Sequence, residues 1–175
     1  MRLRKIGLIA ASLITTLAVT TIGRTDEVSD ARKAVQAAYD REAVAASKLD
    51  VEGMFASHSP GFVAIDSVEG HERKETLKFI KEKDSVFLQN FKSIRRKDTI
   101  RKFRLKGNVA IVDCAVHEIT VMINPDTNKP WPPESSDDIN RDTWVKGKSG
   151  WLMTTSKALS SEHPSKSTRT SKSKA

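Results

Sequence analysis

The chain has 175 residues, of which 38% are hydrophobic and 30% are charged, and its formal net charge is +8. This length suits one domain with a substantial core. The single cysteine, Cys114, excludes an internal disulfide, so packing of the core must hold the fold. Much of the positive charge lies at the two ends of the chain, so strong basicity is not a property of the central part.

The first 23 residues have the pattern of a secretory signal peptide. Arg2, Arg4 and Lys5 precede an uncharged apolar run over residues 6–22, which ends in small residues before Gly23. We therefore expect a leader at 1–23, a domain at 24–159 and a secreted or periplasmic protein that does not contact the membrane once the leader is removed. The alternative is an uncleaved N-terminal membrane anchor. Residues 160–175 are rich in Ser, Thr and Lys and are expected to form a disordered basic tail.

Helical spacing dominates the first part of the domain. Small apolar residues recur from Ala31 to Leu49, which predicts a first helix with Tyr39 on or beside its apolar face. Asp50 is placed to cap a short second helix that extends through Phe55. Residues 62–65 are apolar and predict a short buried strand ending at Asp66.

The rest of the domain predicts one more helix and then strands. A third helix is expected over residues 70–91, followed by strands at 99–106 and 109–123 and a loop at 124–140. Residues 141–155 predict a closing β-hairpin, in which Trp144 and Trp151 flank a turn bearing Gly147 and Gly150. This order predicts an α+β domain whose sheet curls around the first helix.

The chain resembles the nuclear transport factor 2-like superfamily, in particular its SnoaL-like and ketosteroid-isomerase-like bacterial members of unassigned function. The resemblance rests on this element order, on the segments 49–55 and 62–70, and on the final hairpin Asp-Thr-Trp-Val-Lys-Gly-Lys-Ser-Gly-Trp. The resemblance covers about residues 29–159. It implies a cone-shaped barrel, with a strongly curved antiparallel sheet wrapped around three N-terminal helices and a pocket between them.

The resemblance also implies catalytic roles. Tyr39, Asp66 and Asp142 match the positions used by the isomerases, where Asp66 would be the base while Tyr39 and a protonated Asp142 would stabilise an oxyanion. Each residue has a simpler interpretation. Tyr39 could be a packing residue, Asp66 a turn residue bonded to its own backbone, and Asp142 a strand-surface partner of Lys146.

Other side chains are candidates for ligand contact. His117 could project into the pocket from its strand, and Trp131 could cover the pocket mouth from a Pro-rich loop. Phe62 and Trp144 are further expected ligand-binding residues. No spacing of His, Cys or carboxylates predicts a metal site, and no cofactor is expected. The basic residues at 92–106 are interpreted as a solvated strand face, so a nucleic-acid partner is not expected.

Three functions remain open from the sequence. The first is an exported module that binds a small, mostly apolar molecule in the cone pocket. The second is an acid–base enzyme of the isomerase, cyclase or dehydratase type, using Tyr39, Asp66 and Asp142. The third is a non-catalytic domain that forms a homodimer or binds another protein through its open sheet face.

Overall fold

A computed structural model of the chain describes residues 18–68 and 71–162. Six strands form one sheet in the order β2-β1-β6-β5-β4-β3. In chain order the elements are α1 (Ala18–Ser47), α2 (Val51–Met54), β1 (His58–Val68), β2 (His71–Thr76), α3 (Leu77–Phe87), the 3-10 turn η1 (Leu88–Asn90), β3 (Phe91–Lys106), β4 (Val109–Met122), β5 (Glu134–Gly147) and β6 (Gly150–Glu162).

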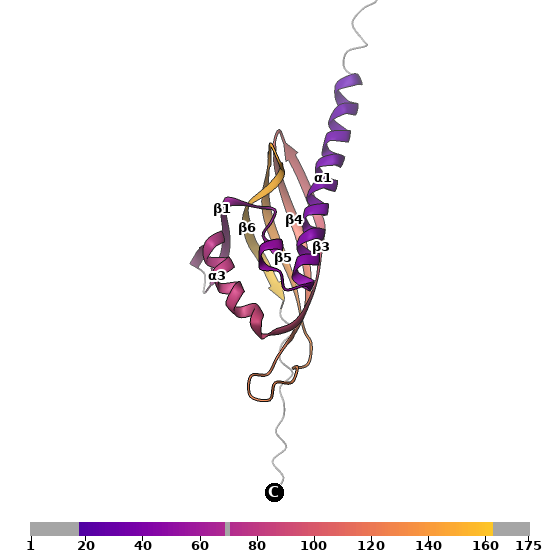
Figure 1. Cartoon of the computed structure of the whole chain (residues 1–175). Coiled ribbons are helices and arrows are strands. Elements are labelled where there is room, and N and C mark those ends of the chain that lie inside the picture. The colour runs from indigo at the N-terminus through magenta and orange to yellow at the C-terminus, as the bar shows by residue number, and fades with distance from the viewer. Residues whose placement is uncertain (1–17, 69–70, 163–175) are drawn as a thin grey trace, which may run out of the picture.

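The helices lie on one side of a curled sheet that does not close into a barrel. Helix α1 packs mainly against β3, and α3 lies nearer to β1 at the other side of the fold (Figure 1). The first turns of α1 project beyond the ends of the strands (Figure 1). The predicted α+β class and the wrapping of a curved sheet around helices are confirmed, and the space between α1, α3 and the sheet is where a pocket is expected.

The core lies between α1 and the concave face of the sheet. Val35, Ala38 and Tyr39 of α1 pack against Val112 of β4 and Trp144 of β5, and all five are nearly inaccessible to solvent. Small residues on this helix face allow the helix to approach the sheet closely, and the large tryptophan fills the space that remains.

Three predicted elements need correction. The sheet is mixed, because β1 runs parallel to β6. Residues 71–76, expected as the start of a helix, form the edge strand β2, whose side chains are mostly exposed and therefore show no apolar alternation. Residues 134–140, expected in a loop, extend β5 and pair with β4 through their backbone, which a sequence of polar side chains does not reveal.

The predicted hairpin is confirmed, and its second strand contains a bulge. Thr143 pairs with Thr155 but Trp144 pairs with Met153, so Thr154 is an extra residue in β6. Its hydroxyl bonds to the carbonyl oxygen of Thr143 at 3.2 Å. Because of this extra residue, Met153 and Ser156, which are three positions apart, both line the interior.

The edge strand β3 carries exposed basic side chains. Arg95, Lys97, Arg101, Lys102 and Arg104 face solvent, while Ile94 and Ile100 are buried. Positive charge along an unpaired strand edge disfavours pairing with another chain.

The structure describes only part of the two ends of the chain. Residues 1–17 and 163–175 lie outside them, so the leader and the tail stay predictions. Helix α1 begins at Ala18, within the stretch assigned to the leader, and β6 continues to Glu162. None of the described helices has the length and apolar character needed to cross a membrane.

The contact between α2 and α1 depends on a glycine. A Cβ atom at Gly53 would lie 2.8 Å from Cβ of Ala45 and 2.5 Å from Oδ2 of Asp50, the residue that caps α2. We expect Gly53→Ala to lower the free energy of unfolding by about 1–3 kcal/mol, although alanine normally favours a helix. Denaturant unfolding would measure this. Gly61→Ala is the control, since no atom lies within 4 Å of its added Cβ, and an equal loss in both variants would contradict the packing account.

Candidate functional site

A cavity of about 340 Å³ lies between the helices and the concave face of the sheet. Its walls are mainly apolar side chains, among them Phe55, Phe62, Phe87, Phe91 and Met153. Polar groups from seven of the elements also line it: Glu42, His58, Asp84, Arg96, Glu118, Asn140, Asp142 and Ser156. An apolar cavity with a few convergent polar groups is the usual form of a small-molecule site.

Helix α1 and strand β5 are joined inside the core by a hydrogen-bonded network. The hydroxyl of Tyr39 donates to Oδ2 of Asp142, and Nε1 of Trp144 donates to the Tyr39 oxygen at 3.1 Å. The two aromatic rings pack edge to face, with centroids 5.2 Å apart. Burial and the neighbouring Asp142 carboxylate raise the pKa of Tyr39, so its hydroxyl keeps its proton. Tyr39 therefore positions Asp142 and directs its own proton to it.

Asp142 presents its other oxygen without a partner. Oδ1 is buried and makes no hydrogen bond, and the residue is only 2% exposed. Burial raises the pKa of Asp142 to about 6, although the nearby Ser156 and the hydrogen-bonded Tyr39 oppose the rise. The carboxylate is thus ionised at neutral pH, and it has one buried oxygen without a hydrogen bond in a residue that lines the cavity.

Glu42 and His58 form a second buried polar pair in the cavity wall. Oε1 of Glu42 lies 3.5 Å from Nδ1 of His58, and neither atom makes a hydrogen bond. Burial raises the pKa of Glu42 to about 8 and lowers that of His58 to about 4. The pair therefore holds one proton and no net charge at neutral pH. The imidazole is fixed by edge-to-face contacts with Phe55 and Phe62, at centroid distances of 5.1 and 4.4 Å.

Arg96 is the basic residue of the cavity wall, and Asp98 binds it. Its guanidinium donates to both carboxylate oxygens of Asp98 at 2.9–3.1 Å. Burial opposes the charge of Arg96, but the Asp98 carboxylate outweighs this and raises the pKa of the guanidinium. Two residues apart on β3, these side chains neutralise each other.

The structure separates Asp66 from the other two residues of the expected catalytic set. Its side chain is 52% exposed and lies 3.8 Å from Arg73. Oδ1 accepts a hydrogen bond from the backbone N–H of Ser67 at 2.7 Å, although Asp66 lies within β1 and not in a turn. Asp66 lines an adjoining hollow with Arg73, Glu75 and Lys83, because β1 is long and places it beyond Phe62 and Ala64. The expected arrangement with Asp66 as base is not formed.

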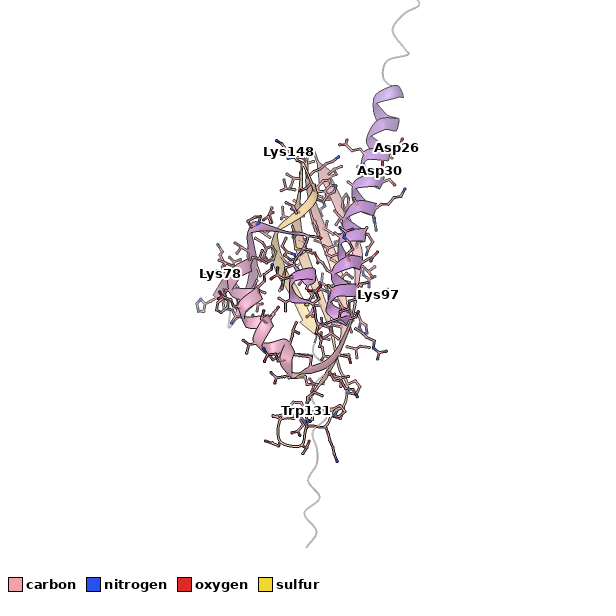
Figure 2. The ribbon with its side chains drawn as sticks, viewed as in Figure 1. Asp26, Asp30, Lys78, Lys97, Trp131 and Lys148 are labelled. Carbon is pink, nitrogen blue, oxygen red and sulfur yellow. The ribbon has the colours of Figure 1, made fainter. Side chains whose placement is uncertain are left out.

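The other expected contact residues are divided between the interior and the surface. Phe62 lines the cavity, and Trp144 is buried beneath Tyr39. His117 is exposed on the outer face of β4 and pairs with Asp137 at 2.9 Å. The expected inward position of His117 is wrong, because β4 begins with apolar residues on both faces and its sequence does not indicate which face is buried. Trp131 lies in the loop at the far end of the molecule (Figure 2) and is not among the cavity-lining residues.

The ion pair expected between Asp142 and Lys146 is not formed, because Asp142 is buried and Lys146 is exposed. Sequence reasoning also missed Glu42, His58, Arg96 and Asp98. Glu42 could have been found from its position three residues after Tyr39, on the same helix face. Among the described residues, no group of His, Cys, Asp or Glu could hold a metal ion.

Comparison with known proteins identifies the fold of the chain. No protein-family model matches the sequence, and no curated protein matches it significantly. Among solved structures, a Salmonella enterica protein of the nuclear transport factor 2-like superfamily is 14% identical and has a TM-score of 0.57, with 83% of this chain and 99% of that chain covered. The chain has the nuclear transport factor 2-like fold.

Two further structures share the fold. The Kfla4162 protein of Kribbella flavida is 14% identical with a TM-score of 0.63, covering 77% of this chain and 94% of that chain. A Novosphingobium aromaticivorans protein, provisionally named a scytalone dehydratase, is 13% identical and has a TM-score of 0.65, with 79% of this chain and 91% of that chain covered. At these identities the likeness concerns the nuclear transport factor 2-like fold and leaves the chemistry to the residues of each chain.

The Glu42–His58 pair predicts a characteristic pH dependence of stability. Below about pH 6.5, the unfolded state binds a proton at His58 and the folded state binds one at Glu42. These two protons have opposite effects on how stability changes with pH, so they offset each other. Between about pH 6.5 and pH 8, Glu42 is protonated in the folded state but not in the unfolded state, while His58 is neutral in both. The free energy of unfolding therefore falls by about 2 kcal/mol as the pH rises through this range. Denaturant unfolding at several pH values should show this fall, and Glu42→Gln should abolish it. A wild-type stability that stays constant over this range would contradict the assignment.

Proposed function

We propose that the protein binds a small, mostly apolar molecule in the cavity, with the molecule's polar group at Asp142, Glu42 and His58. The observation that carries this is the convergence of three buried polar atoms without hydrogen-bond partners on one cavity: Oδ1 of Asp142, Oε1 of Glu42 and Nδ1 of His58. A buried polar atom left unpaired costs about 1–3 kcal/mol, so a ligand that pairs with these atoms is favoured.

The shape and lining of the cavity support the same function. Its volume of about 340 Å³ lies in the range of small-molecule sites, roughly 300–1,000 Å³. Aromatic and aliphatic side chains supply most of the wall, so burial of an apolar body would provide the driving force, and the polar atoms would fix its orientation.

A cavity-filling variant tests this function. Ala64 lines the cavity, so Ala64→Phe places a phenyl ring in it and should weaken binding at least about tenfold. A panel of neutral one- and two-ring alcohols and ketones would be screened by thermal shift, and its best members measured by calorimetry. Ala115→Phe is the matched control, since Ala115 lies outside the cavity on β4, and it should bind as the wild type does. Equal binding by the two variants would refute the proposal.

A second candidate function is proton-transfer catalysis on the bound molecule. The arrangement that favours it is Asp142, a carboxylate with a pKa of about 6 and a free Oδ1, in the same cavity as the proton-holding Glu42–His58 pair. Asp142 would remove a proton from carbon next to a carbonyl or a leaving hydroxyl, and the pair would supply one. This is chemistry of the isomerase or dehydratase type, with Asp142 as base in place of Asp66.

Deuterium exchange would test this candidate separately from binding. A ketone that binds in D₂O should exchange the hydrogens next to its carbonyl faster with the protein than without it, as followed by proton NMR. Asp142→Asn should remove the acceleration, while Asp66→Asn should retain it because Asp66 faces the adjoining hollow. Binding without any acceleration would reject catalysis of this type and leave the binding function intact.

The remaining expectations of the sequence stay predictions. Export rests on the basic and apolar pattern of residues 1–23. Pairing of two copies would use the outer sheet face, where Ile111 and Ile139 are exposed.

A further inference from the structure

The cavity wall carries an excess of acidic groups. Four carboxyl side chains line it: Glu42, Asp84, Glu118 and Asp142. Arg96, the basic residue among the described lining residues, already donates three hydrogen bonds to Asp98. Burial raises the pKa of Asp84 and of Glu118, although Lys83 opposes the rise at Asp84 and Arg96 opposes it at Glu118.

Two of these carboxyl groups each have one oxygen without a hydrogen-bond partner. Oδ1 of Asp142 and Oε1 of Glu42 are buried without hydrogen bonds, and the residues are 2% and 3% exposed. Both residues line the cavity, so a donor bound there would lie beside their carboxyl groups. Carboxylate oxygens accept hydrogen bonds, and an ionised one binds a charged donor more strongly than a neutral donor.

Aromatic rings complete the wall. Phe55 and Phe62 contact the imidazole of His58 on one side, and Phe87 and Phe91 pack on each other with centroids 4.9 Å apart. All four phenylalanines line the cavity. The faces of aromatic rings attract cations, and they also bury apolar surface.

We propose that the ligand of this cavity is an amine: an apolar, ring-bearing body with a protonated nitrogen that donates to Oδ1 of Asp142 while the body packs against the phenylalanines. This rests on the proposed binding function and specifies the chemical class of its ligand. A carboxylate ligand is disfavoured, because it would meet four acidic side chains and a guanidinium that Asp98 already binds.

The protonation of Asp142 gives the interaction a pH dependence. Because burial raises the pKa of Asp142 to about 6, amine binding should weaken as pH falls through that value. The titratable and charged groups around Asp142 come from each packed element: Tyr39 and Glu42 of α1, His58 of β1, Asp84 of α3, Arg96 and Asp98 of β3, and Cys114 and Glu118 of β4.

Three probes that differ only in their terminal group test the proposal: phenylbutylamine, phenylbutanol and phenylbutyrate. Calorimetry with the purified protein at pH 7.5 should show the amine binding about tenfold or more tighter than the alcohol, and no binding of the carboxylate. Asp142→Asn should reduce amine affinity to that of the alcohol, since the amide keeps an oxygen for Tyr39 but carries no charge. Asp126→Asn, in an exposed loop outside the cavity, is the matched control and should change neither affinity.

Circular dichroism would establish that the variants fold. Should Asp142→Asn unfold, Glu118→Gln replaces it, because Glu118 is less buried and should lower the affinity for the amine but not for the alcohol. An alcohol or carboxylate that binds as tightly as the amine overturns the amine proposal and leaves the binding function standing. No binding by these probes or by the neutral panel overturns both.

Discussion

The hydrogen bond between Tyr39 and Asp142 connects the two halves of the fold. It joins α1 to β5 across the interior, and Trp144 holds the same tyrosine oxygen from the next inward position of the strand. A buried hydroxyl, carboxyl and indole must satisfy one another, because water cannot. The network therefore sets how α1 is rotated against the sheet, and with it the direction in which Glu42, one turn further along α1, faces the cavity.

This arrangement explains how an apolar cavity contains ionisable groups. One oxygen of Asp142 is fixed by the network, so the other is held in place without a partner. Arg96 and Asp98 neutralise each other, and Glu42 and His58 together carry one proton. Among the deeply buried groups that the structure describes, Asp142 is thus the one that carries a charge without an ionic partner. An ionised group in a site of low polarity is typical of a site that binds a ligand or reacts with it.

Periodicity and turn chemistry in the sequence predicted the helix bearing Tyr39, the final hairpin and the curled α+β arrangement. These features are local or depend on burial of one face, which a sequence shows directly. The direction of β1 relative to β6, and the face of β4 that carries His117, depend on contacts between distant segments. The resemblance predicted that Tyr39 and Asp142 serve one site, but not that they bond to each other, and the contact between Glu42 and His58 forms only when the chain is folded.

The extra residue Thr154 in β6 has a consequence for comparing sequences. Met153 and Ser156 face inward three positions apart, so the alternation of inward and outward side chains changes phase at Thr154. An alignment that passes through this hairpin without a one-residue gap against an unbulged relative will exchange the two faces of β6 from Thr155 to Ala158, up to the second register shift at Leu159. Residues that face the cavity in one protein would then be matched with surface residues in the other, and a shared site would go unnoticed.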